Sequence, residues 1–419
     1  MKRLIVYTLM LFAGIIFAQQ DDVAYKKRVL EASEIETLFS YYTQDGGNAA
    51  VTGGEGTEEL TDATSTVVLK IPLSQDEILT IDTGLSAYTS ASSSNVNPFD
   101  GRNAANAFSA SSGASRSDVL AYFSPSYTHY SNDRNHIWSA RAYISSEYDY
   151  FSIGFGGSYS YLFNEKNTEL SLSGQVYLDS WNPQYPIEFR GGFENQPGYN
   201  PVFTPFENEN RNSYSATLGF SQILSKRLQA LFTADVVYQS GLLSTPFQRV
   251  YFDDAQDVLV EEFQLADDVE RLPETRFKIP LGVRLNYYAN DWAILRSYYR
   301  FYTDDWGLQA HTASLEVPLK LSDKFTLSPN FRYYNQTKVD YFYEKEEALS
   351  SYEFYTSDFD LAAYSANMYG VELQYKDIFT KTKIYVFGLK SVNLRYSYYK
   401  RNTGLDASIF SLATLFVID

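Results

Sequence analysis

The stretch RFKIPLGVRLNYY, residues 276–288, alternates between two kinds of side chain. Its odd-numbered positions are apolar or aromatic, from Phe277 to Tyr287, whereas its even-numbered positions include Lys278, Arg284 and Asn286. A strand sends successive side chains to opposite faces, but a helix would scatter these residues around its axis. The stretch therefore predicts a β-strand with one apolar and one polar face, and the next question is which medium lies on each side.

The same two-residue period recurs along the chain in segments of about 11 to 16 residues. A soluble sheet alternates in the same way, but its strands average ~5 or 6 residues, whereas a tilted strand crosses a bilayer in ~9 to 11. Because backbone groups in lipid need internal partners, such strands must close into a barrel. The predicted strands are 34–45, 63–74, 77–89, 117–130, 136–148, 150–163, 168–181, 213–224, 228–240, 276–289, 292–304, 306–321, 325–337, 367–379, 384–400 and 406–418.

The connections between these segments sort by length. All of the long links fall at one end, and every connection at the other end is a short turn, as in barrels with long external loops and short periplasmic turns. The sequence thus predicts an all-β fold, a transmembrane antiparallel β-barrel of about 16 strands with long extracellular loops. The long links are 46–62, 90–116, 182–212, 241–275 and 338–366.

Two local features add to this prediction. Consecutive tyrosines such as Tyr41–Tyr42 and Tyr298–Tyr299 close several outward strand ends, and we expect them at the lipid headgroups, where amphipathic rings gather. Segment 34–45 is the least regular strand, and a short amphipathic helix at the periplasmic mouth is the alternative interpretation.

The first 18 residues place Lys2 and Arg3 before an apolar stretch that ends at Ala18, which is the layout of a secretory signal peptide. The apolar run is shorter than the ~20 residues of a membrane-spanning helix, so an uncleaved anchor is the weaker interpretation. We predict a cleaved signal peptide at 1–18, a short periplasmic segment at 19–33 and a barrel at 34–419 in the cell outer membrane.

The composition excludes several classes of function. The chain has no cysteine and a formal net charge of −17, which excludes disulfides and cysteine-ligated metals and argues against nucleic acid, whose phosphates need a basic partner. Its three histidines are His129, His136 and His311, and no Gly-x-Ser-x-Gly elbow accompanies them. We expect structural or interfacial roles for the histidines, no enzymatic activity and no bound cofactor.

Charged residues on the polar strand faces are expected to point into the barrel, because Arg or Lys on the lipid face costs roughly 2 to 4 kcal/mol at the midplane. Opposed charges across a lumen would screen solutes, or they would only pair and hold the wall together. We predict a porin-like channel for small solutes or ions, with a plugged scaffold barrel as the alternative. The predicted pore-lining residues are Lys70, Glu169, Asp179, Lys278, Arg284, Arg296, Arg300, Glu316, Arg332, Glu372 and Arg395.

The segment LFSYYTQDGGNAAVTGGEGTEELTD, residues 38–62, is rich in glycine and acidic residues. Its oxygens would suit a hard cation such as calcium, but the spacing is not that of an EF-hand, and no lysine follows the glycines as in a phosphate-binding loop. An inward-folded loop that narrows the pore and a plain extracellular turn are the other interpretations, and we predict no metal site. The candidate residues are Asp45, Gly46, Gly47, Asn48, Gly53, Gly54, Glu55, Glu58, Glu59 and Asp62.

Together with the signal peptide and the following strands, this block resembles an uncharacterised outer-membrane β-barrel family of Bacteroidetes-type bacteria, a domain of unknown function. The resemblance covers essentially the whole mature chain and implies no assigned activity. Genes of that family often lie near those for a flavin transferase, a thioredoxin-like protein and a small lipoprotein, which implies a link to envelope redox or flavin chemistry. The expected partners are outer-membrane lipids and a small lipoprotein or periplasmic redox protein.

The predicted external loop 241–275 holds nine acidic residues against Arg249 and Arg271. A solvated loop is the simplest interpretation of this charge. Acidic loops that bridge lipid headgroups through divalent ions, or that draw cations toward a mouth, are the alternatives.

Overall fold

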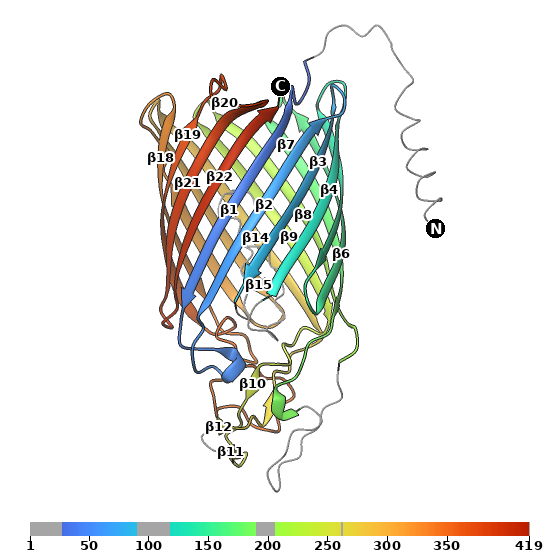
Figure 1. Ribbon diagram of the computed structural model, residues 1–419, viewed down its shortest axis with the longest axis vertical. Helices are drawn as coiled ribbons and strands as arrows, with labels where there is room; N and C mark the ends of the chain where they lie inside the picture. Colours follow the sequence, from blue (N-terminus) through green and yellow to red (C-terminus); the bar gives the residue numbers. More distant parts are fainter. Residues whose placement is uncertain (1–26, 90–117, 190–205, 261–262, 419) are drawn as a thin grey trace, which may run out of the picture.

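The computed structural model describes residues 27–89, 118–189, 206–260 and 263–418, which form a closed antiparallel β-barrel of sixteen long strands (Figure 1). The strands are β1 (Ser33–Asp45), β2 (Leu60–Pro72), β3 (Glu77–Tyr88), β4 (Asp118–Tyr130), β5 (His136–Ser146), β6 (Tyr150–Phe163), β7 (Thr168–Trp181), β8 (Glu209–Ser225), β9 (Leu228–Gly241), β14 (Thr275–Asn290), β15 (Ala293–Asp304), β16 (Gln309–Glu316) with its continuation β17 (Leu319–Lys320), β18 (Phe325–Gln336), β19 (Tyr364–Lys376), β21 (Phe387–Arg401) and β22 (Asp406–Ile418). The predicted fold and strand count are confirmed.

The first strand closes the barrel. β1 pairs with β2 on one side and with β22 on the other, in a register that runs from Ser33 opposite Ile418 to Asp45 opposite Asp406. Each backbone group along β1 therefore has a neighbour, and the sheet has no free edge for lipid to meet. Segment 34–45 is a strand, and the helix interpretation of it is wrong.

One predicted strand is interrupted. Segment 306–321 contains β16 and β17, and Val317 and Pro318 lie between them. Pro318 has no N–H to donate to a neighbouring strand, so the ladder breaks there and resumes at Leu319, which pairs with Leu327 of β18.

Apolar side chains cover the outside of the barrel. Leu85, Phe155 and Leu172 are each more than half exposed, and each alternates along its strand with polar or small neighbours. Such exposure would be costly in water, at about 25 cal/mol per Å² of apolar surface, but not in hydrocarbon. The exposed stripes therefore contact lipid, and the opposite strand face forms the barrel interior.

All three histidines lie on the outer face among aromatic rings. His136 Nδ1 lies 2.6 Å from the Tyr159 hydroxyl, and His311 Nδ1 lies 2.7 Å from that of Tyr299. His129 lies beside Trp138. These positions fit the expected interfacial role for the histidines.

The consecutive tyrosines behave differently from the prediction. Tyr41 and Tyr299 are exposed on the outer face, but Tyr42 and Tyr298 lie on the inner face of the same strands because neighbouring residues of a strand point to opposite sides. Only one ring of each pair can reach lipid, so the expectation that both rings sit at the headgroups is wrong.

Long loops gather at the end of the barrel opposite the start of β1 and the end of β22 (Figure 1), and short turns join the strands at the other end. The loop end is extracellular by the rule for bacterial barrels. Near the periplasmic turns, the Val29 N–H donates to the Gln75 carbonyl. The predicted signal peptide lies outside the described residues, and the described part of the chain contains no helix long and apolar enough to cross a membrane.

The loops fold together into a layer that we call the extracellular cap, made of described residues in 46–59, 182–208, 242–274, 305–308 and 337–363. It includes the short elements η1 (Ala50–Thr52), η2 (Ile187–Phe189), β10 (Arg249–Val250), β11 (Leu259–Val260), β12 (Phe263–Gln264) and β13 (Asp268–Val269). One apolar cluster joins Leu272 and Trp306 to Val339 and Phe342, and a second joins Phe189 and Tyr251 to Leu265. The cap has its own hydrophobic core, whereas the sequence predicted a solvated loop.

Candidate functional site

The eleven residues predicted to line a pore all lie on the strand face opposite the exposed apolar side chains. In a closed barrel that face is the interior. Their role in a solute path stays a prediction. They are Lys70 on β2, Glu169 and Asp179 on β7, Lys278 and Arg284 on β14, Arg296 and Arg300 on β15, Glu316 on β16, Arg332 on β18, Glu372 on β19 and Arg395 on β21.

The two signs of charge occupy different arcs of the inner wall. Acidic residues predominate from β1 to β7, and basic residues predominate from β8 to β18. The acidic arc holds Glu34, Glu36, Asp62, Asp82, Asp118, Glu169 and Asp179 beside Lys70 and Arg141, and the basic arc holds Arg211, Arg276, Lys278, Arg284, Arg296, Arg300 and Arg332 beside Glu209, Asp235, Asp304 and Glu316. Separation of this kind sets a field across the barrel interior.

Four of the predicted lumen residues form a chain of ion pairs. Arg296 lies 2.8 Å from Glu316, Arg395 lies 3.4 Å from the other oxygen of Glu316, and Arg395 lies 2.7 Å from Glu372. The chain connects strands β15, β16, β19 and β21. For these four residues the interpretation that lumen charges pair and hold the wall together is correct.

A glycine keeps the wall clear along this chain. Gly370 on β19 pairs with Asn330 on β18 and Ser397 on β21, and a Cβ at Gly370 would lie 2.6 Å from the Asn330 side chain and 2.7 Å from that of Ser397. Because real Cβ atoms do not approach so closely, glycine lets the Asn330 and Ser397 side chains of the two flanking strands come close to each other over β19.

Two other predicted lumen residues are buried near the extracellular end. Lys278 is 6% exposed and Asp179 is 7% exposed. The Tyr150 hydroxyl donates to Asp179 Oδ2 at 2.5 Å. Strand periodicity placed both residues on the inner face but could not show that other groups cover them.

The cap reaches into the extracellular mouth of the barrel. Phe247, from loop 242–274, packs against Tyr150 and Trp181 on the inner face of β6 and β7. The guanidinium of Arg211 lies 5.2 Å from the Trp181 ring centre, a distance that favours cation–π attraction. Trp181 is fully buried, so this loop narrows the mouth.

A bidentate ion pair joins three loops of the cap. Arg249 Nε and Nη2 donate to the two carboxylate oxygens of Glu188 at 2.6 and 3.1 Å, and Arg249 Nη1 donates to the Val51 carbonyl at 3.0 Å. Glu188 is 1% exposed. A buried carboxylate needs such a partner, so Arg249 holds loops 46–59, 182–208 and 242–274 in one arrangement.

Two further cap carboxyls are held in a less polar environment. Glu270 is 3% exposed and accepts a hydrogen bond from the Thr245 N–H at 2.6 Å and another from the Thr356 hydroxyl. Burial raises the pKa of Glu270 to about 8. Burial, followed by the nearby Asp360 charge, raises the pKa of Asp358 to about 7. Both carboxyls therefore change charge near neutral pH.

The glycine-rich block packs into the cap. Gly53 and Gly54 have φ values of 83° and 93°, in the left-handed region that favours glycine. A Cβ at Gly53 would lie 2.6 Å from the Tyr251 ring, and one at Gly54 would lie 2.9 Å from the Phe359 ring. The block is a docking segment for loops 242–274 and 337–363, and the interpretation as a plain extracellular turn is wrong.

The polar residues of the block mostly make contacts within the barrel rim and cap. The block does not bring its carboxylates together as a metal site among the described residues, where the one such group of three is Asp118, Glu147 and Asp149. The Asn48 side chain donates to the Thr403 carbonyl, and Glu55 forms an ion pair with Lys345. The Glu58 side chain lies against Gly46, the Glu58 N–H donates to the Gly46 carbonyl, and the Glu59 N–H donates to the Thr57 hydroxyl. Asp62 on β2 accepts hydrogen bonds from the Ser86 and Thr64 hydroxyls, Asp45 is the last residue of β1, and a Cβ at Gly47 would meet no atom within 4 Å.

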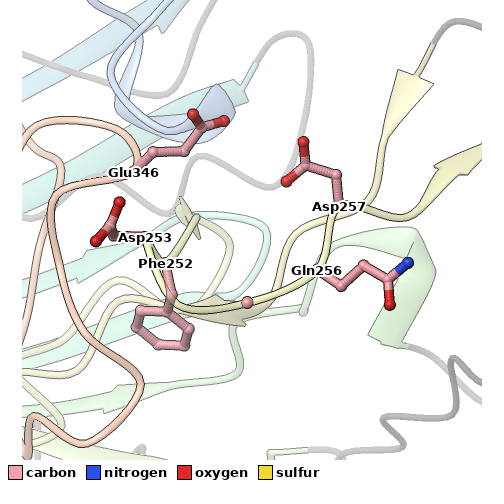
Figure 2. Close-up of a pocket in the computed structure, with 6 residues that line it drawn as sticks. Phe252, Asp253, Gln256, Asp257 and Glu346 are labelled. Atoms are coloured by element: carbon pink, nitrogen blue, oxygen red, sulfur yellow. The ribbon is translucent and has the colours of Figure 1, made fainter.

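The outer surface of the cap has an acidic recess lined by Phe252, Asp253, Ala255, Gln256, Asp257 and Glu346. Figure 2 shows the carboxylates of Asp257 and Glu346 pointing into the gap between their loops, with Gln256 turned away. The Gln264 side-chain amide donates to Asp257 at 3.2 Å and to Glu346 at 3.4 Å. These contacts make the recess part of the packing between two loops.

The cap was not predicted from the sequence because its core is built from residues far apart in the chain. A signal was present, since the predicted acidic loop also carries Phe247, Tyr251, Phe252, Leu265 and Val269. Apolar residues at that density within a long external loop indicate a folded segment. Alternation cannot reveal it, because the loop has no strand period.

A closed barrel with an apolar exterior, a charged interior and long loops at one end defines a transmembrane β-barrel of the bacterial outer-membrane class. The chain belongs to the family described as protein of unknown function (DUF3570), whose model matches residues 3–413. The predicted resemblance to an uncharacterised family is thereby confirmed. The bacterial group and the gene neighbours implied by that resemblance stay predictions.

Solved structures with a similar fold are distant in sequence. A bacterial polysaccharide outer membrane secretin is 10% identical, with 93% of this chain and 99% of that chain covered and a TM-score of 0.46. The outer membrane protein OpdK from Pseudomonas aeruginosa is 9% identical, with 92% and 99% covered and a TM-score of 0.39. A mutant ferric enterobactin receptor from the same organism is 11% identical, with 90% of this chain but 54% of that chain covered and a TM-score of 0.42. No curated protein matches the sequence.

Proposed function

We propose that the protein is a porin-like channel that passes small solutes or ions through the barrel. The observation that carries the proposal is the exposure of charge inside the closed wall, where the Arg296 side chain is 52% exposed. A charged group remains exposed in a barrel interior only beside space that water can fill, because burial without water is costly. Barrels of sixteen strands commonly leave room for such an aqueous channel.

The cap makes the extracellular mouth the narrow part of the proposed path. Phe247 and Trp181 occupy the mouth beside β6 and β7, whereas Arg296 lies in the periplasmic half of β15. Solutes would therefore meet the size limit at the cap and the charged wall below it.

Planar-bilayer conductance of the folded full-length protein tests this function. We expect discrete conductance steps from the wild type and larger or longer openings from Phe247→Ala, which removes the ring that packs in the mouth. Tyr148→Ala is the matched control, because Tyr148 is 79% exposed at the same end of the barrel. A silent wild type together with a silent Phe247→Ala variant would remove the channel proposal.

The second candidate is a plugged barrel that serves as an outer-membrane scaffold for a lipoprotein or a periplasmic redox partner. The apolar core of the cap favours it, because residues such as Trp306 and Val339 are almost fully buried there. This function predicts absence of conductance together with copurification of one stoichiometric envelope protein. Crosslinking in membranes, followed by identification of the captured chain, separates the two candidates.

We also propose that the protein is exported through a cleaved signal peptide and that its function does not involve catalysis. Sequencing the N-terminus of the membrane-inserted protein tests the first, with residue 19 expected at the start of the mature chain. The outward position of the three histidines supports the second, because it places their rings away from the barrel interior.

A further inference from the structure

Three arginines come together on the basic side of the inner wall. The pairing register places Arg284 on β14 opposite Tyr298 on β15, Tyr298 opposite Ser314 on β16, and Ser314 opposite Arg332 on β18. Arg300 follows Tyr298 by two residues on the same face of β15. Four adjacent strands therefore present three guanidinium groups around one tyrosine.

These arginines differ in their partners from Arg276, Arg296 and Arg395 on the same wall. Each of those three forms an ion pair with a carboxylate. Within the described part of the chain, no salt bridge is formed by Arg284, Arg300 or Arg332. Asp235 on β9 has a Coulombic interaction with Tyr298, but it forms no ion pair with any of the three arginines.

The contacts that the cluster does make leave its donors available. The Arg284 guanidinium lies 5.5 Å from the Tyr298 ring centre, and that of Arg300 lies 6.0 Å from the Tyr302 ring centre. Stacking on a ring orients a guanidinium without using its five N–H donors. All three arginines are partly exposed on the barrel interior, so their free donors meet the lumen.

The neighbouring side chains add hydroxyl donors. Arg300 pairs with Gly282 on one neighbouring strand and with Thr312 on the other, and Thr312 pairs in turn with Tyr334 on β18. A Cβ at Gly282 would lie 2.5 Å from the Thr233 hydroxyl oxygen and 3.4 Å from the Tyr298 hydroxyl oxygen. Glycine at position 282 therefore lets the Thr233 and Tyr298 hydroxyl groups approach the wall beside Arg300.

We propose that Arg284, Arg300 and Arg332 form a binding site for small oxyanions, with carboxylate and phosphate groups as the ligand class. Three like charges on one wall repel one another, and an anion that accepts two N–H bonds from a guanidinium fork relieves this repulsion with a geometry that chloride cannot match. The site rests on the proposed function in one respect, since it would set the solutes that the channel prefers.

Equilibrium binding to the detergent-folded full chain tests the site without reliance on conductance. The probes are succinate and inorganic phosphate, measured by calorimetry at low ionic strength. We expect binding by the wild type and at least a tenfold weaker affinity in the Arg300→Gln/Arg332→Gln variant. Lys226→Gln/Arg227→Gln is the charge-matched control on an exposed periplasmic turn, and its affinity should equal that of the wild type.

A conservative variant separates charge from geometry. Arg332→Lys keeps the charge but loses the planar fork, and we expect it to bind more weakly than the wild type and more tightly than Arg332→Gln. Arg332→Lys also provides a test of the site if the double variant fails to fold, since it preserves the net charge of the wall. Equal affinity of all variants and the wild type for both probes would overturn the proposal.

Ion selectivity in a bilayer then distinguishes failure of the binding-site proposal from failure of the channel proposal. Under a potassium chloride gradient we expect the wild-type reversal potential to indicate anion preference and the double variant to shift toward cations. Probe binding by a silent protein would end the channel proposal but retain the site. Conductance without probe binding and with unchanged selectivity would end the site but retain the channel.

Discussion

Phe247 packs edge-on against Trp181, with ring centres 6.3 Å apart and planes at 88°. Trp181 ends a strand of the barrel, whereas Phe247 belongs to a loop 66 positions further along the chain. The contact joins the extracellular cap to the barrel interior, so the stability of the cap and the width of the mouth depend on the same aromatic pair.

Phe247→Ala should loosen the cap. Replacing a buried phenylalanine with alanine costs about 3 kcal/mol or more, which would raise the rate of local opening on the order of a hundredfold. The chain has no cysteine, so Ala266→Cys, at a fully buried position of the same loop, reports opening through its rate of thiol modification. The exposed-site substitution Tyr148→Ala should leave that rate unchanged, and equal rates in both backgrounds would contradict the role assigned to Phe247.

The cap should lose stability as pH rises. The pKa of Glu270 is about 8 in the folded cap against an ordinary value of 4.5, so the folded cap favours the protonated carboxyl. Stability is therefore full below pH 4.5 and is lost as pH rises through 8, by on the order of 5 kcal/mol at complete ionisation. The rate of thiol modification at Ala266→Cys measures the opening of the cap across this pH range. Because the thiolate fraction of a cysteine also rises with pH, Ser351→Cys, at an exposed position, provides the correction.

Glu270→Gln should remove about half of the pH dependence of cap stability. The amide is neutral at every pH, and it can accept the Thr245 N–H bond and donate to the Thr356 hydroxyl, as a protonated carboxyl would. Asp358, whose pKa is raised from 3.8 to about 7, should leave a residual pH dependence of similar size. An unchanged slope in Glu270→Gln would show that other groups control the cap.

Gly53→Ala should destabilise the cap, whereas Gly47→Ala should be nearly neutral. Alanine at Gly53 would adopt a left-handed backbone at a cost of about 1 to 2 kcal/mol, and its Cβ would collide with the Tyr251 ring. Gly47 has no such φ value, and a Cβ there meets nothing within 4 Å. Thiol modification at Ala348→Cys, a buried position in the facing loop, compares the two variants, and equal effects would argue against the docking role of the glycine-rich block.

Arg395→Gln should destabilise the barrel more than Arg296→Gln. Removal of Arg395 leaves Glu372 without its 2.7 Å partner and Glu316 with one partner fewer, whereas removal of Arg296 leaves Glu316 paired with Arg395. Loss of hydrogen bonds to a charged group costs about 2 kcal/mol. Urea unfolding in lipid vesicles measures the difference, and a larger effect from Arg296→Gln would reverse the proposed order.

The barrel itself was predictable from the sequence because its physical cause is local and periodic. Each residue of a spanning strand faces either lipid or the interior, so the two-residue alternation specifies the face of Lys70 or Arg332 without knowledge of any neighbour. Loop lengths then give the orientation. The interrupted segment 306–321 shows the limit of this reasoning, because the alternation continues where Pro318 breaks the ladder.

The tertiary structure alone decided which groups share a site. Arg395 and Glu316 are 79 positions apart, and the register of the closed sheet determines whether an arginine meets a carboxylate, as Arg395 does, or other arginines, as Arg284 does. The cap depends on aromatic contacts between loops that have no periodic pattern. Alternation therefore determined the wall and its two faces, but pairing across strands and packing between loops determined the charged lumen and the narrowed mouth, because those interactions depend on distance in space and not on position in the chain.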